Sequence, residues 1–303
     1  MLQHLNQHTL DKNKWDALVK ESPAANLCHE SWFMDIMAPG WELLVQNDYE
    51  AAFLITPRKK WGMKYLYQPP LIQQGGVFSR YNETIDAGPY LEVIKQNIKF
   101  AEITLNSGNF LLRDDIEKKY LRNQTLSLSK TGDELEKAYS ENHRRNIRKG
   151  KNAGLQYRED APVEKIVSFF RENPGNNQVS LKNSDYENLI RMAGEGKNRG
   201  RIQTPGVYDA GGNLVAGIIL GVFPGRITLL FSGQNPSGKD RAAMFFLIDE
   251  ILKRNSGQNA IFDFEGSNAE GLSRFYGGFG SSDSVYLHIR YNSLPFPWSM
   301  LKK

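Results

Sequence analysis

Two similar pairs of strands, one in each half of the chain, limit the choice of fold. Residues 49–58 (YEAAFLITPR) and 64–71 (KYLYQPPL) resemble residues 214–223 (LVAGIILGVF) and 227–234 (ITLLFSGQ), at an offset of roughly 165 residues. In each half the strand pair is followed by a loop, a predicted helix and a short strand. A duplicated domain accounts for this order of elements, whereas chance similarity between two hairpins is the alternative.

The length of the chain agrees with a duplication, because 303 residues have room for two domains. The predicted boundaries give an N-terminal domain at 1–128 and a C-terminal domain at 129–303, and the last strand or tail is free to return to the first domain. The predicted fold class is α/β with mixed α+β sheets. Each domain is expected to have a mostly antiparallel sheet flanked by helices.

Composition excludes several classes of protein. Hydrophobic residues make up 40% of the chain and charged residues 24%, and no apolar run approaches the roughly 20 residues that cross a membrane. The N-terminus lacks the basic and apolar regions of a signal peptide, so we expect a cytoplasmic protein without a transmembrane segment. The single cysteine, Cys28, excludes an internal disulfide and a cysteine-rich zinc site. The five histidines show no metal-binding spacing, so we expect no metal; the oligomeric state stays open.

The small positive charge of the chain comes from one segment. The formal net charge is +4, but residues 142–158 carry six basic side chains and no acid, so the rest of the chain carries −2. Most of this segment falls in a helix predicted over 131–153, on which Arg144, Arg148 and Lys151 share one face. Such a face suits the phosphates of a nucleotide-linked substrate, a lipid head group or tRNA. Solvated surface charge is the alternative.

The stretch at 261–280 places acids and aromatics in a strand, a turn and a helix. Alternation along the predicted strand puts two phenylalanines on one face and Asp263 and Glu265 on the other, where they face a cleft or solvent. The helix that follows carries Tyr276 and ends at glycines. Its return past the strand end brings Tyr276 within reach of the acids. The alternative for Asp263 and Glu265 is that they cap the helix or form ion pairs. The alternative for Tyr276 is that it packs in the core.

A second candidate site precedes a helix predicted over 239–254. Ser237, Gly238, Lys239 and Arg241 lie just before this helix or within its first turn. Backbone N–H groups at a helix start, together with the helix dipole, bind phosphate, and two basic side chains add to the attraction. An exposed loop with ordinary surface charge is the alternative.

Two motifs resemble the FemAB-like branch of the GNAT N-acyltransferases, whose members contain tandem GNAT domains. The segment HRRNIRKGKNAGL at 143–155 resembles the RRNIRKAEKAG helix end of that family. The segment DFEGS at 263–267, running into RFYGGFG at 274–280, carries the second part of the resemblance. The order of elements from Arg226 onward is that of the GNAT acetyl-CoA-binding core. With the duplication, the resemblance spans nearly the whole chain.

The resemblance implies two tandem GNAT-like domains and an N-acyltransferase that moves an acyl or aminoacyl group directly from an activated donor to an amine. The favoured donor is acyl-CoA, bound at residues 237–241. Glu265 or Asp263 is then the base that deprotonates the amine, and Tyr276 the acid that protonates the leaving group. The basic face of residues 144–151 binds substrate. The acceptor is an amine-bearing small molecule or a cell-wall precursor.

The same residues leave two alternatives. Known FemAB relatives join aminoacyl groups from tRNA to peptidoglycan precursors, so an aminoacyl-tRNA-dependent transferase is the first. The loop at 234–243 has a single glycine where acetyl-CoA-binding GNATs usually have more, and Tyr276 stands where tRNA-dependent members commonly carry a lysine. The donor therefore stays open. The second alternative is a non-catalytic binder of nucleic acid or another anionic ligand on the same fold.

Overall fold

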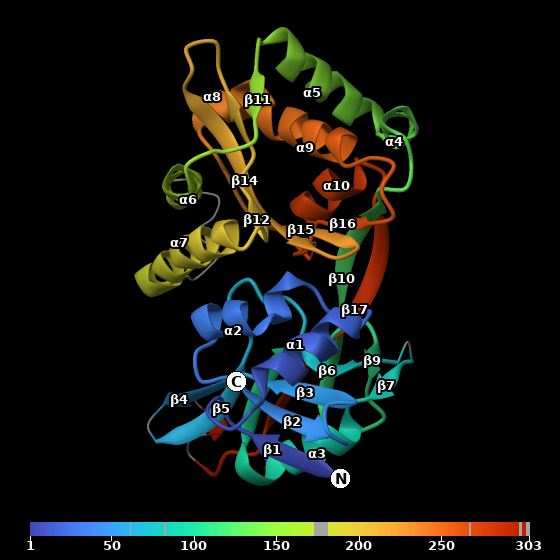
Figure 1. Ribbon diagram of the computed structural model, residues 1–303, viewed down its shortest axis with the longest axis vertical. Helices are drawn as coiled ribbons and strands as arrows, with labels where there is room; N and C mark the ends of the chain where they lie inside the picture. The colour runs from blue at the N-terminus through green and yellow to red at the C-terminus, as the bar shows by residue number, and fades with distance from the viewer. Residues whose placement is uncertain (61, 82, 173–180, 267, 297–298, 301–303) are drawn as a thin grey trace. The chain divides into compact units, whose positions relative to one another are not determined.

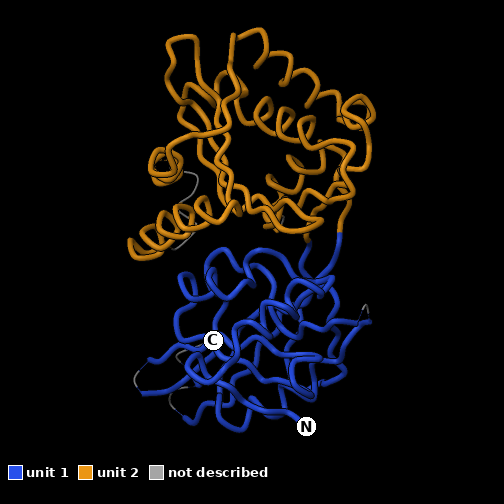
Figure 2. The backbone as a smooth tube through the Cα atoms, viewed as in Figure 1, with its two compact units in different colours: residues 1–122, 284–303 blue, residues 123–283 orange. Residues whose placement is uncertain are grey.

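The computed structural model of the protein describes residues 1–303 except 61, 82, 173–180, 267, 297–298 and 301–303. The chain forms two compact units (Figure 2): unit 1 contains Met1–Arg122 and Ser284–Lys303, and unit 2 contains Asn123–Asp283. Unit 2 is thus inserted in the sequence of unit 1. In the part of the chain that the structure describes, no helix combines the length and the apolar character needed to span a membrane.

Unit 1 contains two main sheets. The first has the strand order β1-β2-β3-β6 and is antiparallel; the second has the order β17-β8-β5-β4, and β7 and β9 form a separate pair. The strands are β1 (Leu2–Leu5), β2 (Glu42–Gln46), β3 (Ala51–Ile55), β4 (Pro57–Lys60), β5 (Met63–Tyr67), β6 (Gly76–Ser79), β7 (Ile85–Asp86), β8 (Phe100–Thr104), β9 (Asn109–Phe110) and most of β17 (Ser282–Asn292). The helices are α1 (Lys12–Glu21), α2 (Ser31–Met37) and α3 (Gly88–Asn97), and a 3-10 turn covers Leu27–His29.

Unit 2 contains one mixed sheet with the strand order β11-β13-β14-β15-β16-β10, and β12 pairs with β14. The strands are β10 (Glu117–Ser127), which enters from unit 1, β11 (Gln156–Arg158), β12 (Ile202–Gln203), β13 (Gly206–Tyr208), β14 (Leu214–Phe223), β15 (Arg226–Gln234) and β16 (Ile261–Asp263). The helices are α4 (Gly132–Ala138), α5 (Glu141–Asn152), α6 (Val163–Arg171), α7 (Asn183–Asn198), α8 (Pro236–Asp240), α9 (Ala243–Arg254) and α10 (Glu270–Gly277).

The same core recurs in both units. In unit 1, β5 leads towards α3 and then β8, and β8 pairs parallel with β5. In unit 2, β15 leads through α8 and α9 to β16, and β16 pairs parallel with β15. Both β5 and β15 also form an antiparallel hairpin with the strand before them, β4 and β14 respectively. This recurrence confirms the predicted fold class, two tandem α/β units with mixed sheets.

Helices cover both faces of the unit 2 sheet, α9 and α5 on one side and α6 on the other (Figure 1). Ile218 joins the core beneath α9, and α5 packs on α9 on that side. Gly217 faces α6 instead: a Cβ there would lie 2.5 Å from Cγ1 of Ile166. A Cβ on Gly233 of β15 would lie 2.2 Å from the Ile166 carbonyl oxygen. Helix α6 reaches the sheet because both positions are glycine.

Two helices that the sequence predicts as continuous are broken. The predicted helix over 131–153 is α4 and α5, because Ser140 has extended backbone (φ −62°, ψ 155°) and caps α5 by accepting the His143 N–H. The predicted helix over 239–254 is α8 and α9, because Ala242 between them adopts left-handed backbone with φ 57°. These breaks change the surroundings of both predicted groups of basic residues.

Candidate active site in the second unit

The carboxylate of Asp263 is held from three directions at the end of β16. Its Oδ2 accepts a hydrogen bond from Nη1 of Arg226 at 2.6 Å, and its Oδ1 accepts one from Nδ2 of Asn123 at 2.9 Å. Oδ1 also accepts the backbone N–H of Glu265 at 3.1 Å. The residue is 1% exposed. Because both oxygens are occupied, this geometry suits an anchor for the backbone of Glu265 better than a base.

Glu265 lies beyond the strand, so strand alternation does not position it as the sequence predicts. β16 ends at Asp263, and Glu265 and Gly266 adopt left-handed backbone with φ of 48° and 52°. A glutamate in this region costs on the order of 1–3 kcal/mol, and such strain clusters at functional sites. Burial raises the pKa of the Glu265 carboxyl well above its usual range, Asp263 raises it further and Arg226 lowers it. The turn therefore presents a carboxyl of raised proton affinity.

Helix α10 brings Tyr276 back to the end of β16. Its ring stacks on Phe264, with ring centroids 4.8 Å apart and an interplanar angle of 26°. Burial, followed by the charge of Glu265, raises the pKa of the Tyr276 phenol to about 12. Phe264 directly precedes Glu265, so the ring of Tyr276 packs at the strand end that carries this carboxyl. Ser267, which belongs to the motif at 263–267, lies outside the described residues.

His143 joins the basic helix α5 to α10, a role that the sequence pattern does not predict. Its Nε2 lies 2.7 Å from the carbonyl oxygen of Phe275, and its Nδ1 lies 2.8 Å from Oγ of Ser140. Burial lowers the pKa of His143, and the Phe275 carbonyl acts in the opposite direction. The ring fits only because residue 278 is glycine: a Cβ on Gly278 would lie 1.9 Å from Cε1 of the imidazole. The neutral imidazole therefore positions the helix that carries Tyr276.

A β-bulge interrupts β15 close to the end of β16. The pairing of β14 with β15 shifts between Ile219 and Leu220, which leaves Leu230 without a partner on β14. The other edge of β15 pairs with β16 in parallel, and this pairing ends where Thr228 meets Asp263. β15 itself continues to Gln234. Bulges redirect backbone groups and occur often beside active sites. Backbone N–H groups of β15 near the bulge are therefore candidates to bind a substrate carbonyl oxygen.

Two buried polar atoms beside Asp263 have no hydrogen-bond partner among the described residues, Oδ1 of Asn123 and Oγ1 of Thr228. Thr228 stands in register with Asp263 on β15, and Asn123 donates to it from β10. Buried polar groups in folded proteins are normally hydrogen-bonded. The end of β16 therefore carries two buried polar atoms whose hydrogen bonds the described residues do not supply.

The residues predicted to bind phosphate belong to α8 and its C-terminal cap. Asn235 caps α8 by accepting the Gly238 N–H at 2.8 Å, so that N–H is already engaged. A Cβ on Gly238 would lie 2.3 Å from the carbonyl oxygen of Val215, which shows how closely α8 packs on β14. Ser237 lies in the first turn of this five-residue helix. The predicted position at the start of the long helix is therefore wrong for Ser237 and Gly238.

The basic side chains of this loop remain at the surface. Lys239 is exposed, and Nη1 of Arg241 lies 3.8 Å from a carboxylate oxygen of Asp209. The long helix α9 begins after Ala242 without a side-chain cap, so the N–H groups of its first turn are the helix-start donors nearest to these cations. Thr228 of β15 pairs with Asp263, and β15 runs on from there to Gln234, just before α8. At about 3.3 Å per residue this length of strand is roughly 20 Å, so α8 is distant from Asp263 and Glu265.

Helix α5 carries the predicted basic face. Arg148 and Lys151 are exposed and Arg144 is partly buried. Nζ of Lys151 lies 3.7 Å from the carboxylate of Asp249 on α9, while Arg144 and Arg148 donate to backbone carbonyls at 3.4 Å. A Cβ on Gly150 would lie 2.8 Å from α9, so the end of α5 packs against the first turn of that helix. The basic face thus lies on a helix that contacts α10 at one end and α9 at the other.

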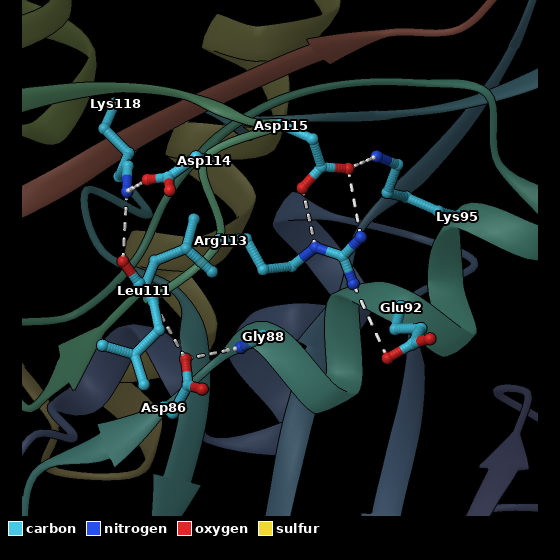
Figure 3. Close-up of polar contacts among 10 residues, drawn as sticks. Asp86, Gly88, Glu92, Lys95, Leu111, Arg113, Asp114, Asp115 and Lys118 are labelled. Carbon is cyan, nitrogen blue, oxygen red and sulfur yellow. Dashed lines mark hydrogen bonds and ion pairs between the residues drawn. The ribbon is translucent and has the colours of Figure 1, made fainter.

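An acidic cluster in unit 1 forms ion pairs (Figure 3). Nε of Arg113 donates to Asp115 at 2.8 Å, and Lys95 binds the other oxygen of the same carboxylate. These two cations lower the pKa of Asp115. Asp114 pairs with Lys118 at 3.6 Å. Within the described ranges, no group of three or more His, Cys, Asp or Glu side chains is placed to hold a metal ion.

Comparison with known proteins identifies the fold. No protein-family model and no curated protein matches the sequence. The structure of FemX is similar with a TM-score of 0.68 and 11% identity, covering 98% of this chain and 99% of FemX. A conserved protein of unknown function from Bacteroides thetaiotaomicron has a TM-score of 0.61 and 11% identity, covering 93% and 96% of the two chains.

A third similar structure is the C-terminal domain of a putative lysylphosphatidylglycerol synthetase from Agrobacterium fabrum. Its TM-score is 0.55 at 10% identity, and the match covers 96% of this chain and 94% of that domain. Identities this low establish the fold and leave the activity to be argued from the site. The chain therefore has the fold of FemX, a tandem pair of GNAT-like α/β units, which confirms the FemAB-like resemblance at the level of the fold.

Proposed function

We propose that the protein is an N-acyltransferase that moves an acyl or aminoacyl group from an activated donor directly to an amine. The observation that carries this proposal is the geometry at the end of β16, where the buried Glu265 stands in a left-handed turn and the buried ring of Tyr276 stacks on the preceding residue, Phe264. Burial raises the pKa of both groups. Acyl transfer to an amine requires such a base and such an acid. The FemX-like fold supports the same class of reaction.

In this proposal Glu265 takes a proton from the acceptor amine. An amine with a pKa of about 10 is protonated at neutral pH, and a carboxylate with a raised pKa removes its proton more readily than an ordinary one. The neutral nitrogen attacks the donor carbonyl carbon, the new C–N bond forms, and the C–S or C–O bond to the leaving group breaks. Tyr276 gives its proton to the departing sulfur or oxygen, and the phenolate regains a proton from the nitrogen, which loses its second proton as it becomes the amide. Asp263, paired with Arg226, positions Glu265.

Negative charge develops on the carbonyl oxygen during this attack. Backbone N–H groups aimed at such an oxygen stabilise it without reorganising. The bulge at Leu230, and the edge of β15 that is no longer paired with β16 after Thr228, supply backbone groups close to the end of β16. We assign the polarisation of the donor carbonyl to this part of β15.

For the donor we propose acyl-CoA first. Lys239 and Arg241 provide positive charge, and the uncapped start of α9 provides backbone N–H groups for a pyrophosphate. Ser237 and Gly238 contribute through the shape of α8 rather than through free N–H groups. Acyl-CoA is a cytoplasmic molecule, so this donor agrees with a cytoplasmic location for the protein.

A second candidate donor is an aminoacyl ester such as aminoacyl-tRNA, with a cell-wall precursor as the amine. The specific observation in its favour is the pKa of Tyr276, which burial raises to about 12. A phenol this weakly acidic protonates a strongly basic alkoxide readily, whereas a thiolate, with a pKa of about 8.5, takes its proton poorly. Arg144, Arg148 and Lys151 would then bind phosphates of the donor or the acceptor.

The test is a transfer assay on the full chain with acetyl-CoA and a panel of primary amines. Glu265→Gln keeps the side-chain shape and removes the base, so we expect kcat to fall roughly 10²- to 10⁴-fold. In the wild type kcat/KM should decline at low pH as Glu265 becomes protonated, and this decline should be absent in Glu265→Gln. Tyr276→Phe should lower kcat and leave acetyl-CoA affinity, measured by titration calorimetry, unchanged. Glu270→Gln and Tyr120→Phe alter exposed side chains of the same types and serve as controls.

The assignment of the catalytic residues and the identity of the donor are tested by different outcomes. If Glu265→Gln and Tyr276→Phe turn over like the wild type, the assignment of chemistry to the end of β16 is wrong. If the wild type neither binds nor uses acetyl-CoA at millimolar concentration but accepts an aminoacyl ester, the second donor replaces the first. If Lys239→Ala combined with Arg241→Ala leaves acetyl-CoA binding intact, the pyrophosphate lies elsewhere.

A further inference from the structure

Unit 1 contains a small polar cavity that the transfer reaction does not use. It lies between the loop that follows α1, the end of β6 and the loop that precedes β9, and its volume is about 50 Å³. One water molecule needs about 10–15 Å³ of such space, so the cavity holds roughly three or four waters or the head group of a small molecule. It is partly open to solvent, which gives a ligand a way in.

One wall of the cavity is fixed by two buried asparagines. Nδ2 of Asn106 donates to the carbonyl oxygens of Gly75 and Val77 at 2.9 and 2.8 Å, and its Oδ1 accepts the Gly108 N–H at 2.9 Å. Oδ1 of Asn109 accepts the Val77 N–H at 2.8 Å. These amides are occupied by the protein itself. They make the wall rigid and leave recognition of a ligand to other groups.

Three other lining residues carry groups suited to a ligand. Ser22 is 5% exposed, and its Oγ has no hydrogen-bond partner among the described residues. Tyr81 is 57% exposed at the rim, although large aromatic side chains are usually covered. Glu83 is exposed and is the charged residue among the described lining residues. The neighbouring Arg80 is paired with Glu21 at 3.3 Å, so the local charge is negative.

We propose that this cavity binds a primary ammonium group. The carboxylate of Glu83 supplies the opposite charge, Oγ of Ser22 accepts one N–H, and the ring of Tyr81 offers its face to the cation. An anion finds no basic partner among the described lining residues, and a divalent metal finds a single carboxylate where it needs several oxygen ligands. A neutral alcohol would leave the charge of Glu83 unused. The volume admits the ammonium head and its first carbons.

The ligand class is therefore a small alkylamine or the amino end of a larger molecule. None of Ser22, Tyr81 and Glu83 belongs to the proposed catalytic set, so the site stands whether or not the transfer reaction is established. The fold does not use the side chain of Ser22 either, because it is the backbone of this residue that forms hydrogen bonds at the end of α1. Variants at Ser22 therefore test binding without disturbing structure.

The experiment titrates the full chain with ethylammonium chloride and follows backbone amides by NMR, with ethanol as the uncharged isostere at matched ionic strength. A ligand of three heavy atoms binds no more tightly than roughly 0.5 mM, so saturation is expected in the millimolar range. Amide shifts should centre on Ser22, Ser79 and Gly108, which line the cavity. Glu83→Gln should weaken binding roughly 10-fold or more, because it removes a charge-assisted bond.

Ser22→Ala should weaken binding by roughly 2- to 10-fold and leave the melting temperature unchanged or higher, since it removes a buried hydroxyl without a partner. Glu92→Gln, an exposed acid paired with Arg113 elsewhere in unit 1, is the matched control and should bind as the wild type does. Equal responses to ethanol and ethylammonium, or no saturable shift up to roughly 100 mM, about 200 times the limiting affinity, would show a cavity that holds water only. A Ser22→Ala variant that loses stability and keeps its affinity would likewise overturn the assignment.

Discussion

Glu265 combines two unfavourable features in one residue. Its left-handed backbone is one that glycine adopts at lower cost, and its carboxyl is buried where the neutral form is favoured. A sequence selected for stability alone would place glycine or an uncharged residue here. Backbone strain and shifted carboxyl pKa values both cluster at functional sites, so this position is the sharpest test of the proposed site.

We predict that Glu265→Gln stabilises the protein at alkaline pH while it reduces activity. The folded-state pKa of Glu265 is raised, so its contribution to stability is present below the unfolded pKa of about 4.3 and is lost as the pH rises through the folded value. Glutamine does not ionise and avoids this loss. Thermal unfolding at pH 8 should therefore show a higher Tm by a few degrees, at roughly 2–4 °C for each kcal/mol.

Near pH 3 the difference in Tm between Glu265→Gln and the wild type should vanish, because the wild-type carboxyl is then protonated in both states. Glu270→Gln, on the surface of α10, should show neither effect. A Glu265→Gln variant that melts below the wild type at pH 8 would mean that the carboxylate makes a net favourable interaction in the folded protein.

At the scale of elements, the sequence predicts the parts that are set by local pattern. The apolar runs of β14 and β15 and the glycine-terminated helix α10 follow from periodicity and turn residues, and the structure contains all three. The pattern also indicates that Glu265 and Tyr276 are neighbours at one strand end. The reason that the pattern gives for the position of Glu265 is strand alternation, but in the structure a left-handed turn at Glu265 positions the side chain.

The features that the sequence does not predict depend on interactions between distant segments. The break between α4 and α5 is fixed by the Ser140 N–H, which donates to the Gly278 carbonyl at 2.9 Å. The break before α9 places Ala242 in left-handed backbone, which alanine does not favour by itself, next to the close packing at Gly150. The bulge in β15 and the contact of His143 with α10 cannot be predicted from the neighbouring sequence either. Tertiary packing determines the two helix breaks, the bulge and this contact.

We predict that the basic face of α5 separates the enzyme from a non-catalytic binder of nucleic acid. The variant reverses three exposed cations together: Arg148→Glu on this face, and Arg145→Glu and Lys149→Glu beside it. It spares Arg144, which is partly buried, and Lys151, which pairs with α9. If the face binds single-stranded RNA, the logarithmic salt slope should fall by about 0.7 for each phosphate that the variant no longer neutralises. The measurement is RNA affinity between low and physiological salt.

Lys20→Glu and Lys119→Glu, on exposed positions away from α5, form the control pair for the RNA experiment. Under the binder hypothesis the triple reversal abolishes RNA retention and the control pair does not. Equal RNA retention by both variants would exclude α5 as a nucleic-acid surface and leave its charge to a small phosphorylated substrate or to solvent.

At the scale of the whole molecule, unit 1 depends on residues that follow unit 2 in the sequence. β17 pairs antiparallel with β8 from His288–Thr104 to Asn292–Phe100. Leu287, Ile289 and Tyr291 of β17 belong to the core of unit 1. Burying three such side chains contributes roughly 4–9 kcal/mol, which is comparable to the whole stability of an ordinary domain.

We predict that a chain ending at residue 283 loses the structure of unit 1 and keeps that of unit 2. Hydrogen exchange should show fast exchange in β8 and β5 and slow exchange in β14 and β15. A chain ending at residue 293 retains β17 and should match the full chain in both units. Persistent protection of β8 in the shorter chain would show that unit 1 closes without β17.

The insertion of unit 2 also sets an order of events on the ribosome. Synthesis of the roughly 160 residues of unit 2 takes about 10–30 s at ordinary translation rates, and β17 leaves the exit tunnel only afterwards. For that time β8 in the nascent chain has an edge without its final neighbour, and such an edge pairs readily with other strands. Unit 2 is free to fold first, and the edge of β8 is the surface that a chaperone must shield until translation delivers its partner.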